Sequence, residues 1–126
     1  MKRLTPIERR DLISKYVNSS KINWAHLCIA QLIKNEYIDR VLTTNFDNLI
    51  VKACSIVQEY PAIYDLTSYT EFRTDLMLDK SILYLHGQYN GFILCNTESE
   101  VNTQKENIKS IFYVFFLSIY FTFCIT

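Results

Sequence analysis

The sequence predicts an α/β protein in which a small, parallel, Rossmann-like sheet of about three strands carries helices on its faces. Two short apolar runs, at residues 41–43 and 82–85, each end in polar residues, as buried strands do when they open into a turn. A segment with helical spacing of apolar residues precedes the first run, and a helix-compatible apolar run follows it. Strands that alternate with helices favour a parallel sheet with helices on both faces.

Length and composition restrict the class of protein. A chain of 126 residues suffices for one small domain, and 13 basic and 13 acidic residues give no net charge. No electrostatic case for a nucleic-acid partner therefore exists. The N-terminus is charged and lacks the apolar core of a signal peptide, and the four cysteines are widely spaced with no C-x-x-C pair. We therefore expect a cytoplasmic protein with reduced thiols.

The first 21 residues predict an N-terminal helix. Thr5 is its cap, Pro6 occupies the first helical position, and Glu8 completes a capping box. Its loose apolar face predicts a solvated amphipathic helix. A second helix is expected from Asn23 to about Glu36, with Asn23 as its cap; we interpret His26, which lies within it, as a partly buried helix residue and not as a ligand or base.

The strand that begins at Val41 is expected to open through a tight polar turn into a helix that runs to roughly Val57. Asn45 can cap this helix with its side-chain oxygen, and Asp47 suits the positive end of the helix. In α/β sheets such a turn lies at the carboxyl end of a strand, where ligands bind.

A second strand, expected at 81–86, ends in a histidine and a glycine. Between the two strands, residues 62–64 predict a short strand and residues 65–80 a polar surface excursion. Because the carboxyl ends of parallel strands meet at one edge of a sheet, we expect Asn45, Asp47 and His86 to converge there in one polar site.

The turn Thr43-Thr44-Asn45-Phe46-Asp47-Asn48-Leu49, followed by Leu85-His86-Gly87, resembles the SIR2-like branch of the sirtuin superfamily. The bacterial SIR2-like domain of antiphage, NAD-depleting proteins is the most similar type, and the resemblance covers roughly residues 24–97. It implies that NAD is the substrate and that the bond between nicotinamide and ribose is cleaved. That reaction passes through a cationic transition state and needs a base.

The resemblance also implies roles for individual residues. His86 would be the base, since an unperturbed histidine has a pKa of about 6.5. Asn45 would position water and ribose, and Asp47 would accept a hydrogen bond from the nicotinamide carboxamide. The remaining residues implied in cofactor binding are Thr43 and Thr44 at the ribose, Phe46 in the same turn, and Gly87, which lets the chain turn away after the base.

The sequence departs from the family pattern in two respects. Sirtuins that hold zinc use two C-x-x-C pairs, whereas only Cys95 lies in the corresponding region, so no zinc is expected. Gly87 and Gly91 are the only glycines, and none supplies the glycine-rich turn that holds a pyrophosphate. We therefore expect residues 22–97 to be a fragment of a SIR2-like core that binds NAD weakly or not at all and is inactive alone.

Residues 98–126 do not resemble the family. They are polar as far as Lys109, and residues 111–126 are uncharged and rich in aromatics. Three interpretations are open: a short membrane anchor, a buried pair of strands, or sequence read after a frameshift or premature end in a longer ancestral gene, which we favour. We expect this tail not to complete the sheet, and we expect deletion of 110–126 to raise the soluble yield without harm to 41–95.

Two other functions stay open beside NAD cleavage. The chain could be a non-catalytic interaction module that kept the sheet edge, because exposed strand edges favour a protein partner or an oligomer. It could also be a small membrane-associated protein whose function lies in 111–126. The genomic sequence just upstream would discriminate, since a strand followed by a glycine-rich loop there would support descent from an NAD-cleaving enzyme.

Overall fold

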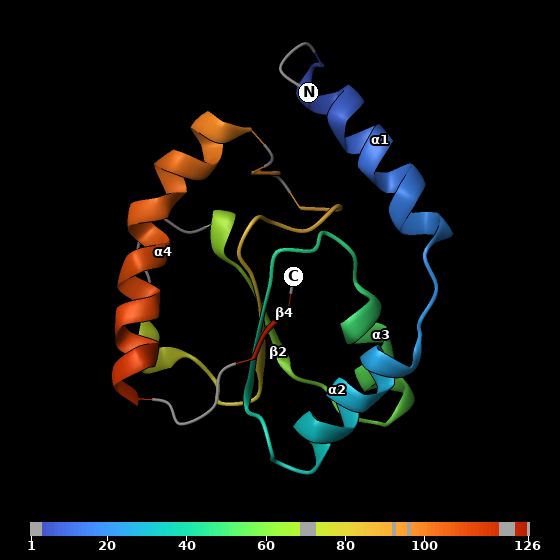
Figure 1. Cartoon of the computed structure of the whole chain (residues 1–126), viewed down its shortest axis with the longest axis vertical. Helices are drawn as coiled ribbons and strands as arrows, with labels where there is room; N and C mark the ends of the chain where they lie inside the picture. Colours follow the sequence, from blue (N-terminus) through green and yellow to red (C-terminus); the bar gives the residue numbers. More distant parts are fainter. Residues whose placement is uncertain (1–3, 69–72, 92, 96, 119–122, 126) are drawn as a thin grey trace.

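A computed structural model describes residues 4–68, 73–91, 93–95, 97–118 and 123–125, which form a three-layer α/β arrangement (Figure 1). The elements in chain order are α1 (Pro6–Ser19), α2 (Trp24–Lys34), β1 (Arg40–Thr43), α3 (Leu49–Ile56), β2 (Ala62–Asp65), two short 3₁₀ turns (Leu66–Ser68 and Thr74–Leu76), β3 (Ser81–Tyr84), α4 (Glu98–Ser118) and β4 (Phe123–Ile125).

The sheet has four strands in the order β2-β3-β1-β4, and every neighbouring pair is parallel. In this register Thr43 is opposite Tyr84, so β1 and β3 end level with each other. The predicted α/β class with a parallel sheet and flanking helices is confirmed, and the short strand expected at 62–64 is β2.

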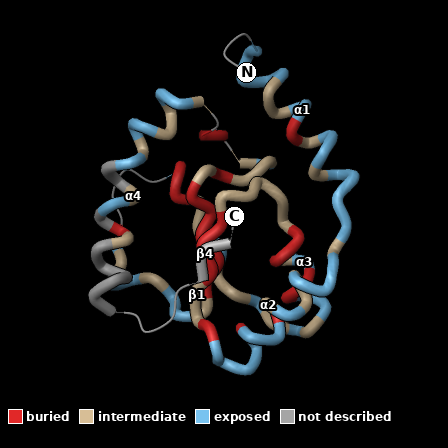
Figure 2. The backbone as a smooth tube through the Cα atoms, in the orientation of Figure 1, coloured by how far each residue is buried: buried red, intermediate tan, exposed pale blue. Residues whose placement is uncertain are grey.

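Helices cover both faces of the sheet, and each face has its own apolar core (Figure 2). On one face Val41 and Ile82 pack against α2 and α3, where Ile33 and Ala53 are fully buried. On the other face the core consists of buried residues from β1, β3, the turns after β2 and β3, and α4: Leu42, Leu66, Leu83, Leu85 and Ile111. Figure 1 shows α4 on the opposite side of the sheet from α2 and α3.

The first two helices begin as their sequences predict. The Thr5 hydroxyl accepts from the Glu8 backbone N–H, and the Glu8 carboxylate accepts from the Thr5 N–H at 2.7 Å. In α2, the Asn23 side chain accepts from the His26 N–H, and His26 Nδ1 accepts from the Asn23 N–H, both at 3.2 Å. His26 is thus half of a capping box, which confirms its interpretation as a helix residue.

The expectation that the chain after Cys95 does not complete the sheet is wrong. β4 pairs with β1 in parallel, Val41 opposite Phe123, and α4 packs on the sheet with Ile111 fully buried. The polar segment before residue 110 has a helical period after all, because half-buried residues recur on one side of α4 at the spacing of successive turns: Val101, Gln104, Ile108 and Phe112. Removal of 110–126 would therefore expose part of the core.

In the described part of the chain, no helix has both the length and the apolar composition that crossing a bilayer requires. α4 has 21 residues, but its first half is polar.

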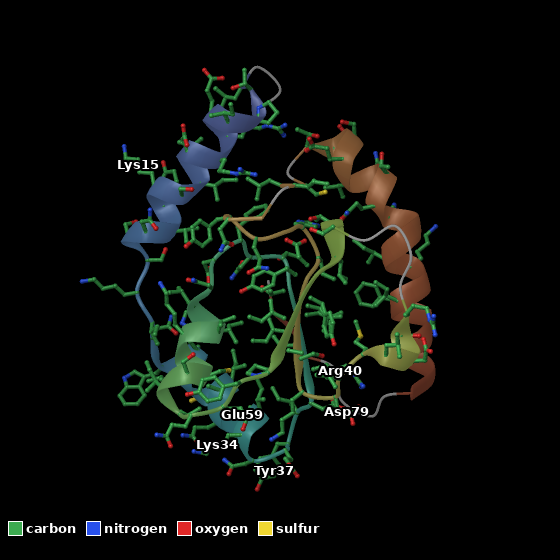
Figure 3. The ribbon with its side chains drawn as sticks, turned by 180° about the vertical axis from the view of Figure 1, so that it is seen from behind. Lys15, Lys34, Tyr37, Arg40, Glu59 and Asp79 are labelled. Carbon is green, nitrogen blue, oxygen red and sulfur yellow. The ribbon has the colours of Figure 1, made fainter. Side chains whose placement is uncertain are left out.

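Ion pairs gather at the amino ends of the strands, the edge away from the predicted site. Arg40 pairs with Asp39 at 3.2 Å and with Asp79 at 2.9 Å, as Figure 3 shows for Arg40 and Asp79. Lys80 lies 3.5 Å from Glu36 and 3.4 Å from Glu59. The side chains of Asp39, Asp79 and Glu36 are exposed, so their ion pairs each contribute little to stability, on the order of 0–1 kcal/mol, whereas the Glu59 side chain is only 18% exposed.

Candidate functional site at the carboxyl edge of the sheet

The connections of β1 and β3 place a crevice at the carboxyl edge of the sheet. These strands are neighbours, but the chain leaves β1 for α3 on one face and leaves β3 for α4 on the other. Such a divergence is a topological switch point, where open α/β sheets bind ligands. The two turns at this point carry the residues that the sequence singled out.

Three hydrogen bonds define the turn after β1. Thr43 Oγ1 accepts from the Asn45 N–H at 3.0 Å, an ST turn that delays the start of the helix. Asp47 Oδ1 accepts from the Leu49 N–H at 2.9 Å, and the Asp47 carbonyl accepts from the Tyr84 hydroxyl at 2.8 Å. The turn is therefore held by its own side chains and by β3.

The prediction that Asn45 caps α3 is wrong, and the expected helix begins later than predicted. The N-cap is Asn48, whose side chain makes no capping hydrogen bond, and the Asp47 carboxylate accepts from the first helical N–H instead. The placement of Asp47 at the positive end of the helix is confirmed. The Asn45 side chain is consequently not used by the helix.

The turn after β3 is joined to the turn after β1. The Leu85 N–H donates to the Thr43 carbonyl at 2.9 Å, and the Tyr89 N–H donates to the Phe46 carbonyl at 2.9 Å. His86 lies between these two contacts, and its own carbonyl accepts from the Cys95 N–H at 2.9 Å. Both turns therefore lie at one edge of the sheet, as the sequence predicts.

Gly87 is required by the backbone of this second turn. Its φ of +91° lies in the region that residues with side chains rarely adopt, and a Cβ there would run into the Ile93 carbonyl oxygen. The glycine therefore lets the chain reverse immediately after His86.

His86 is half-buried, and desolvation by burial lowers the pKa of its imidazole. A lowered pKa keeps the ring neutral at neutral pH, the state in which histidine accepts a proton. No hydrogen bond of the His86 ring to another described residue is seen, so the ring is not oriented by a partner in this part of the chain.

Four of the predicted site residues line the same open groove, which has a volume of about 360 Å³. It is lined on one side by Thr44, Asn45, Phe46 and Asp47, and on the other by α1. His86 and Gly87 do not line it. Thr43 is 1% exposed and its hydroxyl is engaged within the turn.

Sequence reasoning missed Asp65, which ends β2 at the same edge. Its Oδ1 accepts from the Thr67 hydroxyl at 2.6 Å and from the Thr67 N–H at 3.0 Å, and its Oδ2 accepts from the Gln88 N–H at 3.1 Å. Asp65 thereby braces the turn that follows His86. The sequence could have indicated Asp65, because it follows a short apolar run, and Asn45 and His86 were singled out for following apolar runs in the same way.

Among the described residues, no three His, Cys, Asp or Glu side chains lie close enough together to hold a metal ion. Burial raises the pKa of the Cys54 thiol and of the Cys95 thiol to about 11. These thiols are therefore protonated at neutral pH and poorly reactive.

No model of a known protein family matches the chain, and no curated protein is detectably similar to it in sequence.

Proposed function

We propose that the chain is a SIR2-like, Rossmann-like domain, related to the NAD-cleaving enzymes of bacterial antiphage defence, whose carboxyl sheet edge binds the nicotinamide–ribose end of NAD⁺. One observation carries the proposal. The two turns that bear the family's motifs, residues 43–49 and 85–87, are hydrogen-bonded to each other at a topological switch point.

The chemistry of this edge suits a cationic ring that carries an amide. Asp47 Oδ1 is engaged by Leu49, which leaves Oδ2 to accept from a carboxamide N–H and its charge to balance the pyridinium. The Asn45 side chain is not used by α3 and can hold a water or a ribose hydroxyl. His86 is the base in this proposal; it does not line the groove of Asn45 and Asp47 but lies in the turn that is hydrogen-bonded to theirs, and its pKa is lowered by burial.

The structure of this edge gives less support for binding of the NAD⁺ diphosphate. Phosphates bind where backbone N–H groups at a helix N-terminus point at the ligand. At α3 the Leu49 N–H is taken by the Asp47 carboxylate, which repels a second anion. We therefore propose weak binding, with a Kd of about 1 mM or above, which means a binding free energy no more favourable than about −4 kcal/mol. We also propose that this chain alone has no turnover.

Amide chemical-shift mapping with NAD⁺, nicotinamide riboside and ADP-ribose tests the proposal. We expect NAD⁺ and nicotinamide riboside, which both carry the positively charged ring, to shift the amides of 43–49 and 85–89, and ADP-ribose to shift them less. A control compares His86→Gln with His26→Gln, since glutamine at position 26 keeps the capping box of α2. Shifts confined to other parts of the chain, or no shift with any of the three ligands, would overturn the proposal.

Exposed apolar side chains around β2 favour a second candidate function, a non-catalytic interaction module. β2 is an edge strand, and Ile63 on it is 42% exposed. Leu78, whose N–H donates to the Tyr64 hydroxyl beside this strand, is 64% exposed. Light scattering of the native chain and of Ile63→Lys would test self-association through this edge, because an edge lysine blocks strand pairing.

A further inference from the structure

Helix α1 is fastened to the rest of the molecule through Arg9, Arg10 and Ile13, and it stands apart from the three layers at the end where the strands finish (Figure 1). The Arg9 guanidinium makes a bidentate pair with the Glu100 carboxylate, at 3.1 and 3.2 Å. Arg10 Nη2 donates to the Gly91 carbonyl at 2.5 Å, and Ile13 is the buried residue of the helix. These contacts join α1 to α4 and to the loop after β3.

The second half of α1 faces the turn after β1 across the open groove of about 360 Å³. The helix contributes Ile13, Tyr16 and Val17 to its lining, together with its C-cap residue Ser20, and the turn contributes Thr44, Asn45, Phe46 and Asp47. The Tyr16 side chain is 67% exposed, so a ligand in the groove can reach its ring.

The two walls of the groove differ in chemistry. One offers the Asp47 carboxylate and the Asn45 amide, and the other offers an aromatic ring beside aliphatic side chains. A flat cationic ring with a polar substituent satisfies both walls, because its charge is attracted to a carboxylate and to an aromatic face while its edge is hydrogen-bonded.

We propose that α1 forms the outer wall of the nicotinamide–ribose site, with Tyr16 contacting the ligand ring and with Arg9 and Glu100 as positioning residues that hold the wall in place. This inference rests on the proposed function and extends it to residues outside the two motifs.

The ion pair between Arg9 and Glu100 persists throughout the physiological pH range. The hydrogen bonds from Arg9 lower the pKa of the Glu100 carboxyl to about 2, so the pair stays charged. Glu100 also accepts from the Thr97 N–H at 3.0 Å, which caps α4, so a substitution there would disturb two elements. Arg9 is therefore the side of the pair to alter.

Titration of the native chain and its variants with nicotinamide riboside and with NAD⁺, which both carry the cationic ring, tests the role of α1 as a wall of the site, with amide chemical shifts as the readout. Tyr16→Ala should weaken binding by about 3- to 10-fold, the range that loss of one aromatic contact to a cation implies. Lys15→Ala is the matched control, because Lys15 is on the same helix and points away from the molecule (Figure 3), and its affinity should be unchanged.

Arg9→Met removes the charge and should weaken binding, whereas Arg9→Lys keeps one ionic contact and should recover most of the affinity, with circular dichroism showing that the fold of both is retained. Native affinity in Tyr16→Ala, together with loss of affinity in Asn45→Ala, would contradict the proposal that α1 forms a wall of the site, and would leave the proposed function in place. No binding by the native chain would overturn both.

Discussion

The hydroxyl of Tyr84 donates a 2.8 Å hydrogen bond to the backbone carbonyl oxygen of Asp47. Tyr84 ends β3 and is 1% exposed, and Asp47 lies in the turn after the neighbouring strand. Desolvation by burial, and then the nearby Asp47 carboxylate, raise the pKa of the Tyr84 phenol above its usual value, so it remains a donor. One buried side chain thus fixes the turn that carries the proposed site.

Tyr84→Phe removes this donor and leaves the Asp47 carbonyl without its partner. We expect a loss of about 1 kcal/mol in the free energy of unfolding, with broadened amide signals in residues 44–48. Urea denaturation and NMR measure the two effects. Tyr37→Phe is the control, since Tyr37 is 71% exposed; equal stabilities of the two variants would contradict the prediction.

Gly87→Ala places a methyl group against the Ile93 carbonyl at a φ of +91°. The strain should cost on the order of 1–3 kcal/mol of stability. Gly91→Ala should cost less, because its φ is ordinary and its nearest obstacle is the end of the Asp65 side chain, 2.8 Å away. Thermal or urea denaturation of both variants compares them, and a larger loss at Gly91 would refute the assignment of strain to Gly87.

The lowered pKa of His86 predicts a pH dependence of stability. Burial disfavours the charged imidazole in the folded state, so the native chain binds fewer protons than the unfolded chain. Stability should be fully present above the unfolded pKa of about 6.5 and should fall as the pH drops below it towards the folded pKa. His86→Gln should flatten this part of the profile, measured by urea denaturation at a series of pH values.

Ile111→Ala tests whether α4 belongs to the core. Ile111 is fully buried against Leu42 and Leu83. Its truncation should cost about 2–5 kcal/mol, measured as a shift in the urea midpoint. Ile7→Ala, on the exposed side of α1 at 73% exposure, should change stability by less than about 0.5 kcal/mol. A loss at Ile111 no larger than at Ile7 would place this part of the chain outside the core.

The features that local sequence decides were predictable. The caps of α1 and α2 depend on residues three apart, such as Thr5 and Glu8, and the strands at 41 and 81 are short apolar runs with polar ends. The same rule located the edge that unites the turns of Asn45 and His86. The start of α3 was misplaced because Thr43 holds the Asn45 N–H and prolongs the turn.

Features that depend on distant partners were not predictable from the sequence. The helical period of α4 is interrupted by charged residues, and only its packing on Leu42 and Leu83 shows which side is buried. The α1 wall of the groove depends on Arg9 meeting Glu100, 91 residues later in the chain, and no local pattern indicates that contact. Tyr16 therefore had no sequence signal that linked it to Asp47.

The central position of β1 has a consequence for the order of folding. Val41 pairs with Ile82 on one side and with Phe123 on the other, so its two ladders close loops of roughly forty and eighty residues. Doubling a loop adds only about 0.6 kcal/mol of entropic cost, but contacts of such separation slow the search for the native state. The β1–β3 ladder should form first and exchange its amide hydrogens last, while β4 should be the strand that joins late and opens most often.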